Sequence, residues 1–281
     1  MNNKLIILTL TWNAADKLSR LKESLMPAIQ NIDYKWYIKD NASKDNTIEM
    51  SSVWEENIKI IPYKNNSQNF SEGMNFLFNE SKANDEDYIL LLNNDVTFND
   101  SKSIQVMKDI MDSDQTVGVV GARLLFTGTD KLQHAGVVFD ETHNAPMHFR
   151  LHEKTDGQAE KNREFQVVTG AVLLTKAKYF KKVSTSNKSG ISGMDENYHW
   201  AFDDVDFCLA IRHNLNKKVV YCGKTDICHE ESASLKKNPV NKLFMSHNLS
   251  LLRKKWGNKA ILDKSNYIKD QKYNLYKESS K

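Results

Sequence analysis

Residues 88–99 have the sequence YILLLNNDVTFN, an apolar run that ends in two amides and a carboxylate. The consecutive apolar residues 89–92 are typical of a strand buried on both faces, so the segment predicts a central strand of a sheet. Ligands of open α/β sheets bind where such strands end. We therefore expect Asn93, Asn94 and Asp95 to emerge together at one edge of the sheet.

Strand-like and helix-like patterns alternate through the first half of the chain. This order predicts an α/β fold, a mixed and mainly parallel sheet flanked by helices. The predicted strands cover residues 4–12, 34–39, 57–63 and 88–93, and the predicted helices 18–29, 71–81 and 101–112. Residues 117–126, 136–139 and 165–175 predict later strands, which we expect to be antiparallel and to form a smaller part of the sheet.

The chain of 281 residues is long enough for one large α/β domain with an appendage. Its composition, 40% hydrophobic and 27% charged, is typical of a soluble globular protein. No segment approaches about 18 consecutive apolar residues, and the N-terminus leads directly into a strand-like run. We therefore expect a cytoplasmic protein.

Three cysteines are too few and too irregular for a disulfide framework, which indicates a reducing compartment. Cys222, Cys228 and His229 lie close in sequence and could bind zinc, but no C-x-x-C pair accompanies them. Buried free thiols are the favoured interpretation.

Charge is unevenly distributed along the chain. Residues 236–281 contain 12 Lys or Arg and 3 Asp or Glu, a net charge of +9, whereas residues 1–235 carry −6. Residues 243–262 also place apolar side chains at helical spacing beside Arg253, Lys254, Lys255 and Trp256. This basic helical extension is predicted either to pack on the body or to contact a membrane surface.

The first glycine of the chain is Gly73. Dinucleotide-binding and P-loop enzymes need glycines in the first strand-to-helix turn, where the backbone approaches phosphate, so both classes are excluded. Polar residues follow the predicted strands instead: Thr11 and Asn13 after the first, Asp40 after the second and Asp95 after the fourth. They predict a ligand crevice in which a carboxylate holds Mg²⁺ or Mn²⁺ against a diphosphate.

A second cluster, Asp203, Asp204 and Asp206, precedes a predicted helix. Helix capping explains one or two aspartates there, but three crowded carboxylates favour a substrate or cation nearby and provide a candidate general base. His229 follows a short predicted strand, 217–223, and a lone histidine is more often structural than a ligand.

Together these motifs resemble the family 2 glycosyltransferases, inverting nucleotide-sugar enzymes with the GT-A fold, over about residues 4–235. LTLTWNAADKL is similar to the family's first nucleotide-binding strand, DNASKDNT to its D-N-x-S-x-D-x-T, and LLNNDV to its L-N-x-D variant of the D-x-D motif. NFSEGMN resembles a reduced form of its asparagine–glycine helix motif, and FDDVDFC its E-D-x-D with Asp203 replacing Glu. QHAG (133–136) and VTGA (168–171) resemble segments of the rhamnosyltransferase-like branch.

The resemblance implies a role for each matching residue. Asp204 would be the catalytic base, Asp95 and His229 would bind Mg²⁺ or Mn²⁺, and Asp40 would bind the uracil or thymine ring. Contacts with the donor are also implied for Thr11, Asn13, Asn69, Gly73, Asn93 and Asp95. Contacts with the acceptor are implied for Thr169, Gly170, Asp203 and Asp206.

The implied domain covers residues 1–235, with a donor-binding half, 1–100, an acceptor and catalytic half, 101–235, and the basic helical extension 236–281. The implied reaction transfers a sugar from a UDP- or dTDP-sugar to a glycan or polyprenyl-linked acceptor in surface-polysaccharide assembly. The alternative is a degenerate transferase that binds a nucleotide sugar or a partner without turnover. No recognised nucleic-acid-binding motif accompanies the basic extension, so we expect no nucleic-acid partner, while peripheral contact with the inner face of the membrane remains an alternative.

Overall fold

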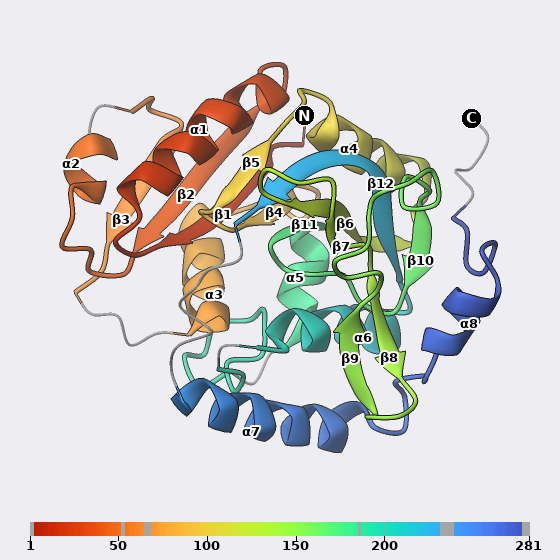
Figure 1. The fold of residues 1–281 in the computed structure, drawn as a ribbon. Coiled ribbons are helices and arrows are strands. Elements are labelled where there is room, and N and C mark those ends of the chain that lie inside the picture. Colours follow the sequence, from red (N-terminus) through yellow and green to blue (C-terminus); the bar gives the residue numbers. More distant parts are fainter. Residues whose placement is uncertain are drawn as a thin grey trace.

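The structure is a computed structural model that describes residues 3–51, 54–64, 69–184, 187–199, 201–230 and 239–276. In this part of the chain, a sheet of ten strands has the order β10-β12-β6-β11-β4-β1-β2-β3, with β5 paired to β12 and β7 paired to β6. Helices cover both faces of the sheet (Figure 1). The predicted mixed, mainly parallel α/β architecture is confirmed.

The elements have the following bounds. The strands are β1 (Leu5–Thr11), β2 (Tyr34–Asp40), β3 (Ile58–Pro62), β4 (Tyr88–Leu92), β5 (Val96–Phe98), β6 (Val117–Phe126), β7 (Leu132–His134), β8 (Val137–Asp140), β9 (Ala145–His148), β10 (Arg163–Phe165), β11 (Val172–Lys176) and β12 (Lys218–His229). The helices are α1 (Ala15–Ile29), α2 (Thr47–Ser51), α3 (Phe70–Ser81), α4 (Ser103–Ser113), α5 (Ala177–Val183), α6 (Asp203–Leu215), α7 (Pro239–Trp256) and α8 (Lys264–Lys269).

The four strands predicted in the first half of the chain form the parallel part of the sheet. β1 pairs in parallel with β2 and β4, and β2 pairs in parallel with β3. Every residue of β4 is buried, as the apolar run 89–92 predicted. Thr11 is the register partner of Asp40, so the carboxyl ends of β1 and β2 lie side by side.

The second half of the chain differs from the sequence prediction in three strands. Residues 165–175 are not one strand, because β10 ends at Phe165 and β11 begins at Val172, where it inserts antiparallel between β4 and β6. The intervening valines have high strand propensity, but Val168 packs over Gly121 of β6 in the core, so tertiary packing overrides the local preference. Residues 137–140 form β8, which pairs with β9 in a separate two-stranded sheet.

The strand predicted at 217–223 is longer than expected. β12 covers Lys218–His229, runs parallel to β6, and at its far end also pairs antiparallel with β5. An irregular register between Cys222 and Ile227 accommodates Gly223, whose added Cβ would lie 2.5 Å from the carbonyl oxygen of Ala159. This length carries His229 from the core to the edge where β4 ends.

Two hydrophobic layers hold the helices on the sheet. On one face, α1 and α4 pack through Leu18, Leu21 and Met107, and on the other α3, α5 and α6 pack through residues such as Leu77 and Phe207 (Figure 1). The alternating faces of β4 contribute to both layers, as expected for a strand covered on both sides. The carboxyl ends of the parallel strands are thereby fixed relative to α1 and α6.

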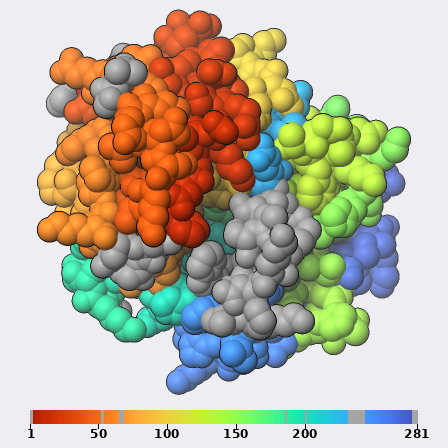
Figure 2. Space-filling view, turned by 60° about the vertical axis from the view of Figure 1, so that its left-hand side comes forward, coloured from red at the N-terminus to blue at the C-terminus, as the bar shows by residue number. Residues whose placement is uncertain are grey.

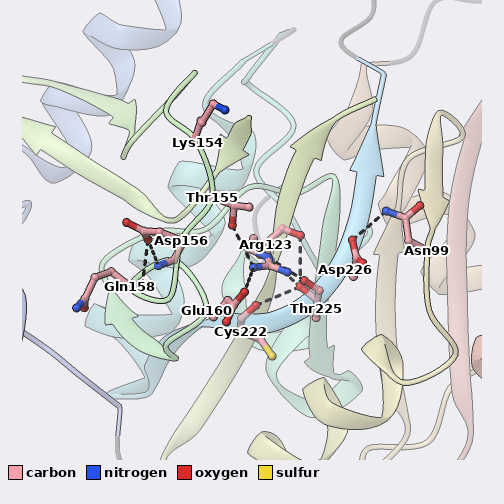
Figure 3. A network of polar contacts seen from close by, with 12 residues as sticks. Asn99, Arg123, Lys154, Thr155, Asp156, Gln158, Glu160, Cys222, Thr225 and Asp226 are labelled. Atoms are coloured by element: carbon pink, nitrogen blue, oxygen red, sulfur yellow. Dashed lines mark hydrogen bonds and ion pairs between the residues drawn. The ribbon is translucent and has the colours of Figure 1, made fainter. Parts of the chain in front are cut away.

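A polar network holds the segment around residues 154–160 against the sheet (Figure 3). The Arg123 guanidinium on β6 donates from Nε to the carbonyl oxygen of Thr225, at 3.0 Å, and from Nη1 to Thr155 Oγ1, at 3.2 Å. Glu160 Oε1 lies 3.7 Å from the same Nη1. The buried guanidinium therefore joins β6, β12 and this segment.

The C-terminal extension packs on the body through the inner face of α7. Leu252 and Trp256 are buried, and the Tyr267 ring of the following helix stacks on Phe165 at 4.4 Å. Asp206 on α6 is fully buried and accepts hydrogen bonds from Trp256 Nε1, at 2.7 Å, and from Lys255 Nζ. Of the two predicted alternatives, packing on the body is therefore observed. None of the helices in the described ranges has the length and apolar character needed to cross a bilayer.

Replacing Trp256 with Phe keeps an apolar ring but removes a donor to the buried Asp206 carboxylate. We expect the free energy of unfolding, measured by urea titration, to fall by about 1–3 kcal/mol. Leu243→Ala, on the exposed face of the same helix, is the control and should change it by less than about 0.5 kcal/mol. An unchanged urea midpoint for Trp256→Phe would contradict the assigned contact.

Candidate functional site

A sharp corner between β4 and β5 carries Asn93, Asn94 and Asp95. The N–H of Asn93 donates to the carbonyl oxygen of Ala171, at 2.9 Å, and β5 then turns back to pair with β12, with Val96 opposite His229. The N–H of Glu230 donates to the carbonyl oxygen of Asp95, at 2.9 Å. Backbone pairing thus places Asp95 beside His229.

The side chains of this corner meet as the sequence predicted. His229 Nε2 lies 3.0 Å from Asp95 Oδ1 and 3.3 Å from Asn93 Nδ2. Asn94 Nδ2 donates to Thr11 Oγ1, at 3.1 Å, and so joins the corner to the end of β1. The Asp95 residue is only 6% exposed, and a carboxylate so enclosed requires a charged or hydrogen-bonding partner.

Gln133 fixes the orientation of the His229 ring. Its Nε2 donates to the carbonyl oxygen of His229, at 3.3 Å, so its Oε1 is the atom that faces His229 Nδ1, at 2.6 Å. Nδ1 therefore carries a proton, and in the neutral imidazole Nε2 presents a lone pair toward Asp95.

The spacing of this carboxylate and imidazole fits a divalent cation. Adjacent ligands of an octahedral Mg²⁺, each bonded at about 2.1 Å, lie about 3.0 Å apart. That is the separation of Asp95 Oδ1 and His229 Nε2. Within the described ranges no group of three or more His, Cys, Asp or Glu side chains could hold a metal. A Mg²⁺ or Mn²⁺ ion held by this pair would take its other ligands from substrate phosphates and water.

Cationic side chains of α1 approach the same corner. Lys17 Nζ lies 3.5 Å from Asp95 Oδ2 and 3.4 Å from Glu230 Oε2, and Arg20 Nη2 lies 2.7 Å from Glu230 Oε1. In Figure 2 the light-blue end of β12 is visible between the red N-terminal segment and the yellow-green residues beyond β5. The edge therefore combines a carboxylate–imidazole pair with two cations, each of which is paired with a carboxylate.

The carboxylate predicted as the base is held at the start of α6. Asp204 Oδ2 accepts a hydrogen bond from the N–H of Gly170, at 2.9 Å, and its Oδ1 accepts from the N–H of Val205, at 2.8 Å. Phe202, which precedes the helix, has φ of 66°, a left-handed conformation that is costly for a bulky residue. This strain turns the chain so that Asp203 and Asp204 begin the helix beside residues 169–171.

Burial raises the pKa of Asp203 to about 7, and the neighbouring Asp204 carboxylate adds to this effect. The pair thus joins a carboxyl that is readily protonated to a carboxylate held by two backbone N–H groups. A carboxyl whose pKa is strongly raised by burial is a candidate for a functional site.

The donor residues predicted at the ends of β1 and β2 also lie together. Asp40 accepts from the N–H of Ser43, at 3.0 Å, and from its hydroxyl, while the N–H of Asn13 donates to Ser43 Oγ, at 2.8 Å. Asn13 Oδ1 accepts from the N–H of Lys44, at 2.7 Å. Asp40 and Asn13 therefore order the turn after β2 as well as lining this edge.

Asn69 and Gly73, predicted as donor contacts, make structural contacts on α3. Asn69 caps the helix, with its Oδ1 accepting from the N–H of Glu72 and its Nδ2 donating to the carbonyl oxygen of Glu196. A Cβ at Gly73 would lie 2.7 Å from the Leu10 side chain, so glycine permits close packing of α3 on β1. These contacts explain both residues without a ligand.

Asp206 does not join the other predicted acceptor residues. Its carboxylate is enclosed between α6 and α7, where Tyr198, Lys255 and Trp256 bond to it. Residues two positions apart on a helix point to different sides, so Asp204 and Asp206 cannot face the same ligand. The predicted acceptor contact of Asp206 is corrected to a structural role.

Sequence analysis missed several residues at the site. Trp12 is 51% exposed between Thr11 and Asn13, and Lys17 lies in the first turn of α1; both belong to LTLTWNAADKL, but the motif gave neither a role. Lys39 is fully buried behind Asp40, with Nζ 3.9 Å from the centre of the Tyr63 ring, and burial lowers its pKa to about 8. Gln133 stood within QHAG, but only the fold shows its contact with His229.

A cavity of about 280 Å³ lies elsewhere in the fold, between the segment after β9 and α8. Its walls include Arg150, Arg163, Tyr221 and Tyr267 and none of the predicted site residues. Arg150 pairs with Asp156 and Arg163 donates to main-chain carbonyls, so both cations are satisfied within the protein. We therefore place the functional site at the strand ends.

The fold and this edge together define a class of protein, a GT-A glycosyltransferase fold with a carboxylate–imidazole pair at the end of β4 and a base candidate held by the neighbouring residue Gly170. The model of the family described as "Glycosyl transferase family 2" matches residues 6–220. The chain therefore belongs to glycosyl transferase family 2, as the motifs predicted.

Among curated proteins, an abequosyltransferase of Salmonella typhimurium is 35% identical over 96 residues. The match covers 34% of this chain and 29% of that protein, so it spans under a third of the relative's length. It supports the family, whereas the predicted rhamnosyltransferase-like branch stays a prediction.

Solved structures share the fold. Staphylococcus aureus TarS 1–349 in complex with UDP-GlcNAc aligns with a TM-score of 0.58 at 12% identity, over 84% of this chain and 61% of that chain. A mannosyltransferase from Pyrobaculum calidifontis in complex with GDP-Man and Mn²⁺ aligns with a TM-score of 0.57 at 10% identity, over 83% and 58%. At such identities these likenesses establish the GT-A fold alone.

The raised pKa of Asp203 predicts how stability depends on pH. Burial favours the protonated form of Asp203 in the folded state. Below about pH 4 this carboxyl is protonated in both the folded and the unfolded state, and it costs the fold least. As the pH rises from about 4 to about 7, the folded state becomes less stable relative to the unfolded state. Asp203→Asn removes this loss, so we expect the melting temperature of the variant to exceed that of the wild type increasingly from about pH 4 to about pH 7 and by a constant amount above that. Each kcal/mol corresponds to about 2–4 °C.

The measurement is thermal unfolding in metal-free buffer, with the exposed Asp130→Asn variant as control. Melting curves of Asp203→Asn and wild type that stay parallel across this pH range would contradict the assigned environment of Asp203.

Proposed function

We propose that this protein is an inverting glycosyltransferase that moves a sugar from a UDP- or dTDP-sugar to a hydroxyl group of a glycan or polyprenyl-linked acceptor. One observation carries the proposal: adjacent residues link the two parts of the site, because Asn93 N–H donates to Ala171 O and Gly170 N–H donates to Asp204 Oδ2. These contacts fix the positions of the proposed leaving-group site and the base candidate relative to each other.

In the proposed reaction Asp204 accepts the proton of the acceptor hydroxyl as that oxygen attacks the anomeric carbon. The bond from this carbon to the donor diphosphate breaks, and the nucleoside diphosphate leaves with the electron pair from the opposite face. A single displacement inverts the anomeric configuration. The two backbone N–H groups on Asp204 hold its carboxylate in position, which reduces the entropic part of the barrier.

Asp95 and His229 are the residues that would hold Mg²⁺ or Mn²⁺, and a bound divalent cation supplies Lewis-acid stabilisation of the leaving diphosphate. Lys17 places a positive charge 3.5 Å from Asp95 Oδ2. It would favour binding of the anionic donor at this edge.

The nucleoside would lie over the ends of β1 and β2. Asp40 would accept a hydrogen bond from a uracil or thymine ring, and the half-exposed Trp12 would stack on the base or sugar. Thr11 and Asn13 would contact the nucleoside or ribose, and Asn93 would contact the ribose or donor sugar. Thr169 and Gly170 would line the acceptor side together with Asp203.

We further propose a role in surface-polysaccharide biosynthesis at the inner face of the membrane. The relative in Salmonella typhimurium is an abequosyltransferase, which supports the transfer of a sugar. On α7, Leu243 is 73% exposed and Met245 is 46% exposed, and the cations Arg253 and Lys254, further along the same helix, are also exposed. Exposed apolar and basic groups on one helix favour contact with an anionic lipid surface, through which lipid-linked acceptors would be reached.

The test is sugar release or transfer from UDP- and dTDP-sugars in the presence of Mn²⁺. Asp204→Asn should lower the rate by about 10²–10⁴-fold, because the amide cannot accept the proton. Donor affinity, measured by calorimetry, should stay within about twofold, and Asp130→Asn should retain full activity.

Normal turnover by Asp204→Asn would contradict the assignment of the base. A wild-type protein that binds donor but never releases or transfers sugar would favour the alternative, a degenerate transferase that serves as a binding protein.

A further inference from the structure

We propose that Gln133 and His134, neighbours on the short strand β7, are positioning residues that orient the two halves of the site. Gln133 orients the His229 ring, and His134 orients the backbone that holds Asp204. This inference rests on the proposed function and assigns residues that belong to neither the metal pair nor the base.

β7 has an irregular pairing that explains how two adjacent residues reach the site. In its pairing with β6, His134 lies opposite Leu124 and Leu132 opposite Leu125, so Gln133 is the extra residue of a bulge. Bulges redirect side chains and occur next to active sites. Both residues are almost completely enclosed, with Gln133 8% exposed and His134 fully buried.

Gln133 makes two hydrogen bonds to one residue. Its Oε1 lies 2.6 Å from His229 Nδ1 and its Nε2 lies 3.3 Å from the carbonyl oxygen of His229. The first contact fixes which nitrogen carries the proton, and the second fixes which way the glutamine amide faces. The result is a ring whose Nε2 points at Asp95, 3.0 Å away, as a metal ligand must.

His134 acts on the other half of the site. Its Nε2 accepts a hydrogen bond from the N–H of Thr169, at 3.3 Å, while its Nδ1 lies 2.9 Å from His148 Nδ1. An accepting Nε2 makes Nδ1 the donor in a neutral ring, and burial lowers the pKa of His134 well below its usual range.

The residue next to Thr169 is Gly170, whose N–H donates to Asp204 Oδ2. Fixing the peptide at Thr169 therefore also fixes the direction of the donor on Asp204. One strand bulge thus holds both the imidazole beside the cation pair and the amide on the base, which keeps their separation constant.

The two residues can be tested separately, because Gln133 should affect the Mn²⁺ dissociation constant and His134 should affect kcat. Gln133→Met removes the hydrogen-bonding groups but keeps the approximate shape of the side chain. We expect it to weaken Mn²⁺ binding by about 10–100-fold, as the loss of a group that orients a metal-binding histidine does. Gln133→Glu restores an acceptor for His229 Nδ1 and should keep the Mn²⁺ dissociation constant within about threefold of wild type.

Mn²⁺ binding is measured by electron paramagnetic resonance of free Mn²⁺, with Mn²⁺ alone and with UDP added. Gln166→Met is the matched control, because Gln166 is also buried and hydrogen-bonded, to Ile261 and Asp263, but lies outside the site. It should lower the melting temperature and leave the Mn²⁺ dissociation constant unchanged.

His134→Phe keeps a buried ring and removes the acceptor for Thr169. We expect kcat for sugar transfer to fall by about tenfold or more, while KM for the donor and the Mn²⁺ dissociation constant stay within about twofold. His134→Gln, whose amide oxygen can accept the same hydrogen bond, should recover part of kcat. If His134 had only a structural role, His134→Phe would lower stability and would change kcat and the Mn²⁺ dissociation constant together.

The outcomes separate this inference from the proposed function. If wild type and Gln133→Met bind Mn²⁺ with equal affinity, the role of Gln133 is overturned. The proposed function is unaffected by that result. Equal kcat for wild type and His134→Phe overturns the role of His134. Wild-type protein that binds no Mn²⁺, with or without UDP, overturns both the proposed metal and the inference about Gln133.

Discussion

The antiparallel pairing of the short strand β5 with the end of β12 is the constraint on which the site depends. β4 emerges from the core of the sheet, and without β5 its polar end would extend into solvent. Because β5 turns back and pairs Val96 with His229, the carboxylate of Asp95 is placed beside an imidazole that belongs to a strand far away in sequence. The burial of β4 and the length of β12 make this pairing rigid.

A second constraint joins this corner to α6. β11 runs antiparallel beside β4, and the peptide at its start accepts from Asn93 and leads back to Gly170. Gly170 then donates to Asp204, whose helix begins after the strained conformation of Phe202. Strain of this kind persists only where surrounding packing overdetermines it, and here Val205 and Phe207 anchor the helix in the core. The energetic cost is thus local, and its effect is to place Asp204 against the N–H of Gly170.

Sequence reasoning predicted the parallel strands correctly. A short apolar run such as 89–92, once the helices around it are recognised, is compatible with few structures other than a buried strand. Sequence reasoning also brought Asn93, Asp95 and His229 to one place, although only family resemblance suggested the histidine. It failed where packing outweighs local preference: residues 166–171 leave the sheet despite their valines, and β12 continues beyond Gly223. It also failed for Asp206, because a cluster of like residues conceals that helix geometry separates them.

The central claim is that Asp95 and His229 form the protein's share of a divalent-cation site at the sheet edge. Anomalous diffraction from crystals grown with Mn²⁺ and UDP tests it most directly. The account predicts a manganese peak bonded to Asp95 Oδ1 and His229 Nε2, with the diphosphate completing its coordination. Manganese bound elsewhere, or held by the nucleotide with neither side chain as a ligand, would contradict it.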